Sequence, residues 1–348
     1  MASENSSRHK SGFALVAAAF CCAIIVVALG AFTRLVDAGL GCPDWPGCYG
    51  HLLWPIQDHN VVRANEAWPH MPVDHSKTWP EMVHRYFAGF LGVLIAIIAV
   101  KAWRRREEHD YPFRLPVLLL FVVVWQALFG MWTVTLKLWP QVVTLHLIGG
   151  MTVLSLLWLL ANRLANVRWH FDVDAFARLM RLKPWVIAAI VIVAIQILLG
   201  GWTTSNYAAY ACPDFPTCHR EWVPPMDLAK GFDIFQTIGP NYLGGQLENE
   251  ARVAIHYMHR VGALVVTVYL LLLAIRLMVM GDRRLKAMAW AVLAALALQI
   301  SLGIGNVLMH IPLGMAVAHN AGAGLLLITL VSLASRVWMA RPGETTQP

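Results

Sequence analysis

GAFTRLVDAGLGCPDWPGC at residues 30–48 and GGWTTSNYAAYACPDFPTC at residues 200–218 align without a gap at an offset of 170. Each stretch begins at the end of an apolar segment and continues into a loop of the form Cys-Pro-Asp-aromatic-Pro-x-Cys. Because self-similarity at a fixed offset is the signature of repeated structural units, the pair suggests that the chain contains one unit twice.

Two further blocks repeat in the same order. Residues 81–85 match residues 256–260 at an offset of 175, and residues 126–150 match residues 299–323 at an offset of 173. Three blocks in one order at a nearly constant offset indicate a tandem duplication. The two predicted units span residues 1–172 and 173–348.

The composition is that of a membrane protein. Hydrophobic residues make up 58% of the chain and charged residues 14%, whereas soluble domains contain about 45–50% apolar and about 25% charged residues. Apolar runs of about 20 residues, the length that crosses a bilayer as a helix, recur along the chain. They predict eight spans, four in each unit, at roughly residues 13–34, 82–103, 115–136, 141–162, 184–205, 253–280, 286–309 and 313–338.

The predicted fold is therefore an all-α integral membrane protein in the lipid bilayer, with eight transmembrane helices arranged as two tandem four-helix bundles. Because each unit has an even number of spans, both units enter the membrane in the same direction. This predicts a pseudo-two-fold axis along the membrane normal.

The distribution of positive charge predicts the orientation. The net charge is +7, and most Lys and Arg residues lie on one side of the spans, at Arg8 and Lys10 and in segments 101–114, 163–183, 276–286 and 336–341. The positive-inside rule places this side, with both termini, in the cytoplasm. The charge thus reflects topology, and we expect no nucleic-acid partner. The short segment before the first span predicts an uncleaved anchor without a transit peptide, which favours the bacterial cytoplasmic (inner) membrane.

Six histidines lie in or at the edge of predicted spans, where an ionisable side chain is costly and usually functional. In each unit, one lies on the second span and one on the fourth: His84 with His146, and His259 with His319. Two imidazoles from facing helices at matched depth suit a six-coordinate haem, so we predict two haem sites near the outer surface. The chain has no CxxCH motif, which excludes a covalent c-type haem. Histidines that only bond a neighbouring helix, or that bind zinc or copper, are alternatives.

Arginine and glycine residues near these histidines fit the same interpretation. Arg85 and Arg260 each follow a histidine directly and are candidates to pair with haem propionates, although snorkelling to lipid head groups is an alternative. Small residues would let a flat macrocycle approach the backbone, or would only mediate helix packing. These glycines are Gly89, Gly149, Gly150, Gly262, Gly322 and Gly324.

The two units differ at one chemically important position. Glu81 precedes His84 by three residues, which places both on one helix face, and the matching position in the second unit is His256. A carboxyl group there could transfer protons or position a substrate, which makes Glu81 a catalytic candidate. The alternative is that Glu81 caps the start of its helix. His256 competes with His259 as a ligand, and we place His310 at a helix end.

Four cysteines form two pairs with five intervening residues, Cys42 with Cys48 and Cys212 with Cys218. Both pairs lie on the predicted outer side, which is oxidising, and a disulfide closing so short a loop contributes roughly 2 kcal/mol. A metal site that includes His51 or His219 is an alternative. Cys21 and Cys22 are expected to be packing residues. We expect the polar and aromatic loops at residues 35–79 and 206–251 to cover the outer ends of the haem sites.

These motifs together resemble the haem A synthase family over nearly the full chain. The resemblance rests on the four-span repeat, Glu-x-x-His-Arg at residues 81–85, His-Arg at residues 259–260, the histidines on the fourth and eighth spans, and the paired outer cysteines.

The resemblance implies a membrane oxidoreductase that converts haem o to haem a. The methyl group at porphyrin position 8 becomes a formyl group through two hydroxylations and loss of water, and the product serves cytochrome oxidase. It implies haem b at His259 and His319, and haem o at His84 and His146 beside Glu81. In part of the family the first cysteine pair is linked to haem handling. Implied partners are haem o synthase, cytochrome oxidase assembly factors and an electron donor that the residues do not identify.

Two other classes of function fit the residues alone. A dihaem b-type cytochrome could relay electrons from quinol without catalysing haem oxidation, and parallel repeats also occur in transporters. The residues predict two diverged haem sites, whereas oxidation of the methyl group follows only from the resemblance.

Overall fold

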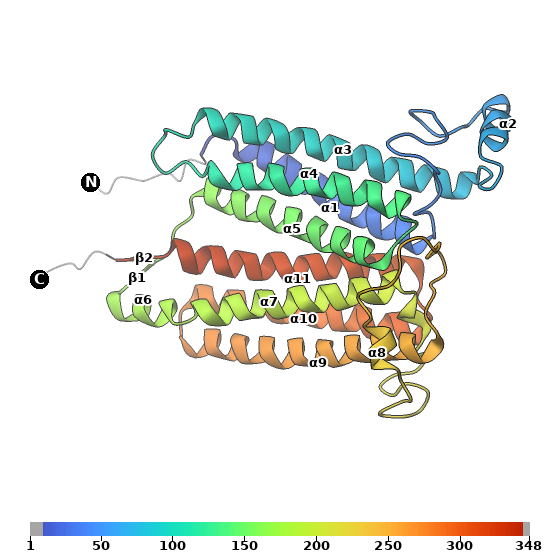
Figure 1. The fold of residues 1–348 in the computed structure, drawn as a ribbon. Coiled ribbons are helices and arrows are strands. Elements are labelled where there is room, and N and C mark those ends of the chain that lie inside the picture. The colour runs from blue at the N-terminus through green and yellow to red at the C-terminus, as the bar shows by residue number, and fades with distance from the viewer. Residues whose placement is uncertain (1–9, 344–348) are drawn as a thin grey trace, which may run out of the picture.

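Eight long helices form most of the chain that the structure describes, which is residues 10–343 of a computed structural model (Figure 1). Arg8 and the outermost residues of the two predicted units lie outside the described residues. The elements in chain order are α1 (Phe13–Leu35), α2 (Asp58–Ala67), α3 (His75–Arg104), α4 (Arg114–Thr135), α5 (Pro140–Ala165), β1 (His170–Phe171), α6 (Val173–Met180), α7 (Lys183–Ser205), η1 (Ala208–Tyr210), α8 (Leu228–Gly231), α9 (Asn249–Val279), α10 (Arg283–Leu308), α11 (Leu313–Met339) and β2 (Arg341–Pro342).

All eight predicted spans are confirmed as helices that are long and apolar enough to cross a membrane. The second and sixth spans begin earlier than hydropathy predicts, with α3 starting at His75 instead of residue 82 and α9 at Asn249 instead of residue 253. The first turns of both helices contain polar residues, so a hydropathy profile does not count them as part of the spans. Because α3 begins at His75, Glu81 lies well inside this helix.

Aspartate side chains cap the starts of two of the eight long helices. Asp74 accepts a hydrogen bond from the Ser76 N–H at the start of α3, and Asp282 accepts hydrogen bonds from the first N–H groups of α10. Such caps satisfy backbone donors that have no partner within the helix. The hydrogen bond from the Ser76 hydroxyl also lowers the pKa of Asp74.

The long helices form two groups of four. In the first group α1 packs against α3 and α5, and α4 packs against the same two helices. In the second group α7 and α10 each pack against α9 and α11. Figure 1 shows the first group above the second, with the helices of each group side by side. The predicted pair of tandem four-helix units is therefore present.

The two groups meet along α1, α5, α7 and α11. Helix α5 contacts α7 and α11, and α1 contacts α11. Trp158 of α5 donates its indole N–H to Ser332 of α11 at 2.6 Å, and Thr144 of α5 is hydrogen-bonded to Ser205 of α7 at 3.1 Å. The contacts α1–α11 and α5–α7 correspond to each other in the repeat, as a two-fold axis would require. The axis itself stays a prediction.

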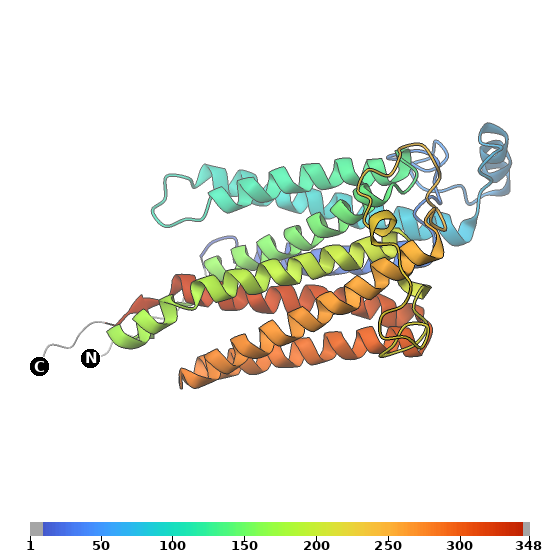
Figure 2. The ribbon, with the colours of Figure 1, turned by 60° about the horizontal axis from the view of Figure 1, so that its bottom comes forward.

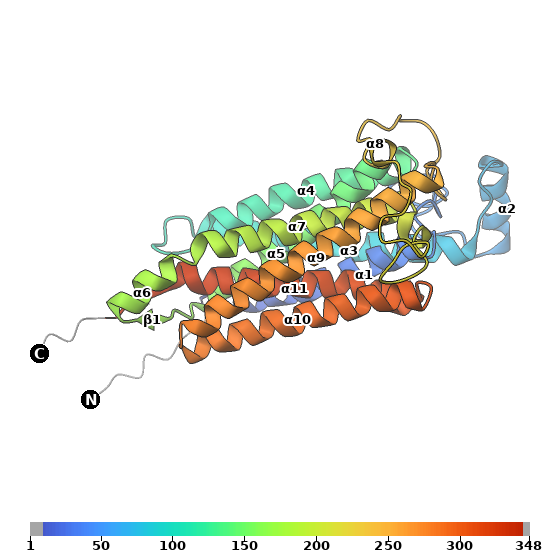
Figure 3. The same cartoon turned by 90° about the horizontal axis from the view of Figure 1, so that it is seen from below.

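The connecting segments lie at the two ends of the bundles (Figures 2 and 3). We call the end with α2 and α8 the outer end, and the end with α6, β1 and β2 the inner end. The outer segment at residues 206–248 reaches across to the first unit. Tyr242 donates its N–H to the Lys137 carbonyl at 3.0 Å, and Trp139 donates its indole N–H to the Gln236 carbonyl at 2.9 Å. This segment therefore covers the corner between α4 and α5, as expected for an outer cover.

Candidate functional site

His84 of α3 and His146 of α5 face each other inside the first unit. Their ring centres are 6.5 Å apart and their ring planes are perpendicular. An imidazole nitrogen bonds a metal at about 2.0–2.1 Å, so two imidazoles on opposite sides of one iron have ring centres about 6 Å apart. The structure therefore brings the two predicted ligands of the first site together at a separation that suits one haem iron.

Each of the four predicted ligand rings lies against a glycine of a neighbouring helix. In every case this glycine is five residues before the last residue of its helix. A methyl group at any of these glycines would crowd the ring. The distances from that methyl carbon to the ring Cε1 atom are 3.0 Å for Gly30 and His84, 3.5 Å for Gly130 and His146, 3.2 Å for Gly200 and His259, and 3.1 Å for Gly303 and His319.

The four histidines lie at matched depths in the two units. His84 and His259 are nine and ten residues after the first residues of α3 and α9, while His146 and His319 are both six residues after the first residues of their helices. At 1.5 Å per residue, these steps correspond to about 14 Å and about 9 Å from the outer helix ends. The second unit thus repeats the placement of ligands in the first.

Amide side chains approach both histidines of the second unit. Gln196 Nε2 of α7 is 3.1 Å from His259 Nδ1 and donates to the His259 carbonyl at 2.9 Å. Gln299 Nε2 of α10 is 3.4 Å from His319 Nε2. The Oε1 atoms of both glutamines are buried and have no hydrogen-bond partner among residues 10–343. These carboxamides are therefore polar groups placed directly beside the predicted ligands.

The chemistry of the histidines fits a haem at each pair. Nδ1 of His84, His146 and His319 is buried and completes no hydrogen bond within the described part of the chain. In each case the carbonyl four residues before the neighbouring glycine approaches the ring. An imidazole that binds iron through Nε2 carries its proton on Nδ1 and directs it at such an acceptor. Residues 10–343 contain no cluster of three or more His, Cys, Asp or Glu residues that could hold a zinc or copper ion.

Glu81 joins α3 to the first cysteine loop. Its Oε2 atom accepts a hydrogen bond from the Cys42 N–H at 2.9 Å, and its Oε1 atom is paired with the Arg85 guanidinium. The side chain is buried. Because Asp74 caps α3, the alternative that Glu81 caps this helix is wrong.

His256, at the matching position of α9, also contacts an outer segment. Its Nδ1 atom is 3.2 Å from the Ala208 carbonyl oxygen, and the side chain is buried. His256 is therefore engaged with the backbone after α7, which leaves His259 as the histidine that faces the bundle interior. His310 is exposed and lies two residues beyond the end of α10, as predicted.

The two arginines after the ligand histidines hold the cysteine loops. Both guanidinium groups donate to backbone carbonyls of their loop. For Arg85 these are the carbonyls of Asp44 at 3.0 Å, Pro46 at 3.3 Å and Gly47. For Arg260 they are those of Cys212 at 2.9 Å, Asp214 at 2.8 Å and Thr217 at 2.7 Å. Arg260 Nε is buried and has no partner among the described residues, so one donor of this side chain is still available. Propionate pairing by the two arginines stays a prediction.

Both predicted disulfides are confirmed, Cys42 with Cys48 and Cys212 with Cys218. The alternative of a cysteine metal site with His51 or His219 is therefore wrong. The backbone of His51 pairs with Cys48, and His219 Nε2 is 2.8 Å from the Ala211 carbonyl oxygen. Of the other two cysteines, Cys22 is buried as predicted, whereas Cys21 is exposed.

One aspartate in each loop holds the turn after the cysteines. Asp44 accepts hydrogen bonds from the N–H groups of Tyr49 and Gly50 at 2.6 and 2.8 Å. Asp214 accepts the corresponding bonds from His219 and Arg220 at 2.6 and 2.9 Å. The hydroxyl of Thr217 and then these N–H groups lower the pKa of Asp214 to about 2. Asp214 is therefore ionised throughout the physiological range, as a stable acceptor for this turn.

Several of the glycines near the predicted ligands pack against side chains of neighbouring helices, which is the helix-packing alternative. Gly149, Gly262 and Gly322 do not leave room for a macrocycle, because glutamine side chains from the neighbouring helices fill the space beside them. Gly324 packs against Leu154 and Met151 of α5. The glycines that contact the ligand rings were not predicted, although they lie near the ends of the predicted spans and repeat between the two units. They are Gly30, Gly130, Gly200 and Gly303.

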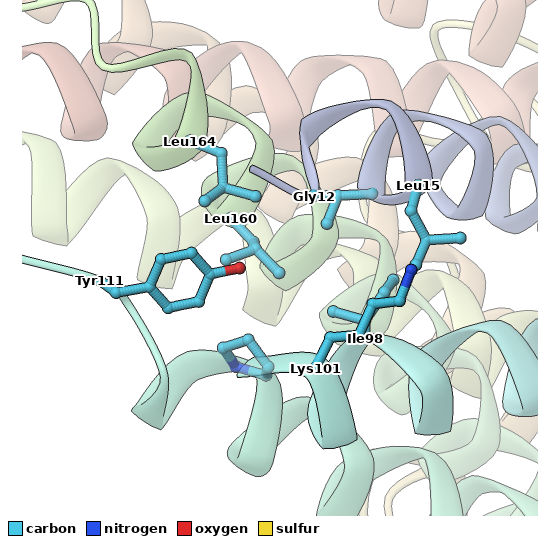
Figure 4. A pocket seen from close by; sticks show the side chains of 9 residues that line it. Gly12, Leu15, Ile98, Lys101, Tyr111, Leu160 and Leu164 are labelled. Carbon is cyan, nitrogen blue, oxygen red and sulfur yellow. The ribbon is translucent and has the colours of Figure 1, made fainter. Parts of the chain in front are cut away.

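Two surface pockets are not lined by the predicted ligands. One pocket lies at the inner end of the first unit, where Tyr111 and Lys101 face Gly12 and the end of α5 (Figure 4). A second, also at the inner end, is lined by residues of β1, α6 and the start of α10. We therefore place the candidate site at the paired histidines and not at either pocket.

Comparison with known proteins identifies the family of the chain. Residues 13–331 match the COX15-CtaA family, described as cytochrome oxidase assembly protein. A relative from Shewanella oneidensis named Heme A synthase is 44% identical over 315 residues, which cover 90% of this chain and 93% of the relative. A protein of the same name from Sphingopyxis alaskensis is 29% identical, and the alignment covers 89% of this chain and 87% of the relative. Another from Halalkalibacterium halodurans is 25% identical, and the alignment covers 88% of this chain and 90% of the relative. The duplicated four-helix chain with paired histidines therefore belongs to the COX15-CtaA family of cytochrome oxidase assembly proteins.

Proposed function

We propose that this protein is a membrane enzyme that synthesises haem A for cytochrome oxidase, by oxidising the position-8 methyl group of haem o to a formyl group. Each of two successive hydroxylations inserts one oxygen atom and removes two electrons from the methyl carbon, so the reaction needs an external oxidant and a source of oxygen; loss of water from the dihydroxylated carbon then gives the formyl product. The observation that carries the proposal is the pairing of His84 with His146 inside the first unit. His259 and His319 occupy the corresponding positions of the second unit, each with its ring beside a helix-end glycine. Membership in the family, with relatives named Heme A synthase, supports the reaction.

The two units have different roles in this proposal. The first unit, residues 1–172, holds haem o between His84 and His146. The second unit, residues 173–348, holds a haem b cofactor between His259 and His319. The different side chains at the matched positions of Glu81 and His256 support this division, because identical tasks would not require a carboxylate in one unit and an imidazole in the other.

The protein side chains position the two haems and close the outer ends of their sites. The four histidines supply axial nitrogen atoms, and the neighbouring glycines allow the rings to reach their positions. When bound, haem b supplies one-electron redox chemistry. Glu81 accepts or delivers a proton beside the substrate, while Arg85 and Arg260 pair with propionates in addition to holding the disulfide loops.

The proposed location is the bacterial inner membrane, with the inner end of the bundles and both termini in the cytoplasm. The positive charges at the inner end support this orientation. The haem sites then lie towards the outer leaflet, and both disulfides face an oxidising compartment. Haem o synthase is the proposed source of the substrate, and oxidase assembly factors receive the product.

Analysis of extracted pigment tests the reaction. The protein is expressed in cells that supply haem o, purified, and its haems are separated by reversed-phase chromatography. We expect haem b together with haem o or haem a, and haem a in the membranes. The control is a His84→Ala/His146→Ala variant, which should retain haem b and form no haem a. Haem b alone in the unmodified protein would indicate the electron relay instead, and a protein without haem would indicate a transporter.

A further inference from the structure

Three of the four predicted ligand histidines share a side-chain arrangement that we call the amide lock. It consists of a glutamine four residues before the glycine that contacts the ring, and a second glycine three residues after the histidine. The glutamine side chain lies directly against this second glycine. The three locks are Gln126 with Gly149 at His146, Gln196 with Gly262 at His259, and Gln299 with Gly322 at His319.

The second glycine is required for the lock. A methyl group at Gly149 would lie 1.6 Å from Gln126 Nε2, and methyl groups at Gly262 and Gly322 would lie 2.2 and 2.4 Å from the Oε1 atoms of their glutamines. These separations are far below van der Waals contact. The glutamine and the glycine are therefore one unit, because the carboxamide occupies the volume that any larger residue would need.

His84 has no amide lock. The positions that correspond to Gln196 and Gly262 in the repeat are Val26 and Phe87. Valine offers no hydrogen-bonding group, and phenylalanine fills the place of the glycine. The Val26 carbonyl approaches His84 as the matching carbonyls approach His146 and His319. Val26 and Phe87 thus replace the glutamine and the glycine of the lock at His84, while the backbone contact to the ring is kept.

The lock acts on properties that determine how firmly a histidine holds a metal. Groups that bond the second ring nitrogen fix the tautomer and the ring orientation, and losing one costs roughly 10–100-fold in metal affinity. At His259 the carboxamide lies 3.1 Å from Nδ1 and also bonds the histidine backbone. At His319 the Gln299 carboxamide approaches the other ring nitrogen, Nε2, at 3.4 Å.

We propose that the amide lock retains haem at His146, His259 and His319, and that its absence makes His84 the exchangeable ligand through which haem enters and leaves the first unit. The proposal rests on the proposed function in one respect, because a unit that takes up a substrate haem and releases a product haem needs one ligand that dissociates readily. The second unit, which keeps its haem, has two locked ligands. Gln126, Gln196 and Gln299 are positioning residues in this scheme.

A reciprocal exchange of side chains tests the proposal. The first variant, Val26→Gln/Phe87→Gly, gives His84 a lock, and the second, Gln196→Val/Gly262→Phe, removes the lock from His259. A matched control, Val26→Leu/Phe87→Gly, makes the same space without an amide. Gln196→Leu removes the amide and keeps its size. Each protein, in lipid nanodiscs and loaded with haem b, is mixed with excess apomyoglobin, and transfer of haem is followed by absorbance.

The unmodified protein should release its two haems in two phases. Val26→Gln/Phe87→Gly should slow the fast phase roughly 10-fold or more and leave the slow phase unchanged, whereas the leucine control should leave both phases unchanged. Gln196→Val/Gly262→Phe and Gln196→Leu should accelerate the slow phase roughly 10–100-fold. If the unmodified protein retains only one haem per chain, the Val26→Gln/Phe87→Gly variant must retain two.

Several results would overturn the proposal. If the fast phase responded to the Gln196 variants and not to the Val26 variants, the exchangeable ligand would lie in the second unit and not at His84. An unchanged slow phase in Gln196→Leu would show that the amide does not hold haem, and this variant carries the test if the Phe87 variants do not accumulate. Transfer of haem b does not depend on haem o oxidation, so haem a extracted from the same membranes tests the proposed function separately.

Discussion

The Glu81 carboxylate accepts a hydrogen bond from the Cys42 N–H at 2.9 Å, so the helix that carries His84 is bonded directly to the first disulfide loop. Arg85 strengthens the connection, because its guanidinium pairs with Glu81 and donates to three carbonyls of the same loop. The carboxylate thus has both a structural contact and a position one helical turn from a predicted ligand.

Glu81→Gln separates the two roles of this carboxylate. The glutamine can still accept the Cys42 N–H but loses the charge, so we expect the protein to fold and retain haem b in the second unit. If Glu81 transfers protons, haem a should fall roughly 10²–10⁴-fold, and a hydroxylated intermediate should accumulate if only the second oxidation is impaired. Haem extraction from the membranes measures the outcome.

The matched control for Glu81 is Asp74→Ala at the cap of the same helix. A changed cap costs at most about 0.5–2 kcal/mol of stability, so this variant should lower the melting temperature without preventing haem a formation. Near-normal haem a in Glu81→Gln would restrict Glu81 to its structural contacts.

His259→Ala and His319→Ala should each remove haem b from the purified protein, because each deletes one of two axial nitrogen atoms. The pyridine haemochrome assay, expressed per mole of protein, gives the haem content. His310→Ala is the control, since His310 is exposed at a helix end and should leave the content unchanged. Full haem content in both ligand variants would remove the second site from the proposal.

The ring contacts of the four glycines predict a graded series. Gly30→Ala, Gly303→Ala and Gly200→Ala place a methyl group 3.0 to 3.2 Å from a ligand ring and should reduce haem retention, whereas Gly130→Ala, at 3.5 Å, should be tolerated. Absorbance spectra of the purified variants check the order. Gly92→Ala has open space and is the control. Equal loss of haem in all of these variants would contradict the prediction that the effect depends on the distance between the added methyl group and the ring.

Thiol labelling tests the disulfides. In denatured but unreduced protein, Cys21 and Cys22 should react with a maleimide, whereas the four loop cysteines should react only after reduction. Mass spectrometry of the labelled peptides locates the modified residues. A maleimide on Cys42 or Cys212 before reduction would show that the loop is open.

Arg260→Ala should loosen the second disulfide loop, because it removes three hydrogen bonds to loop carbonyls. We expect the Cys212–Cys218 bond in native protein to be reduced several-fold faster by a mild thiol reagent, since loop hydrogen bonds contribute about 0.5–1.5 kcal/mol each. Arg220→Ala is the control, because that side chain is exposed and has no described partner. Equal reduction rates in both variants would mean that Arg260 does not restrain the loop.

Much of the fold could be predicted because the relevant signals are local or repeated. Runs of apolar residues mark all eight spans, and the repeat identifies the pairs His84–His146 and His259–His319 without any structure. The early starts of α3 and α9 were not predictable from hydropathy, since their polar first turns resemble loops.

The details of the site were less predictable because they depend on contacts between helices. Gly149 and Gly30 are equally small residues near a ligand, and only the helix packing shows that one accommodates a glutamine and the other a histidine ring. The loop contacts of Arg85 were missed for the same reason. Their acceptors are backbone carbonyls, which every residue possesses and which leave no mark in the sequence.

The connection between the two units is bonded to both ends of the described chain. Lys10 donates its N–H to the Leu164 carbonyl at 2.8 Å, while Arg341 and Gly343 donate theirs to the Trp169 and Phe171 carbonyls at 2.9 and 2.6 Å. The chain is thus nearly closed into a ring at the inner end. A circular permutation that opens the connection and joins residue 343 to residue 10 through a short linker would exchange the order of the units while keeping every helix contact. Such a protein would be synthesised with its second unit first.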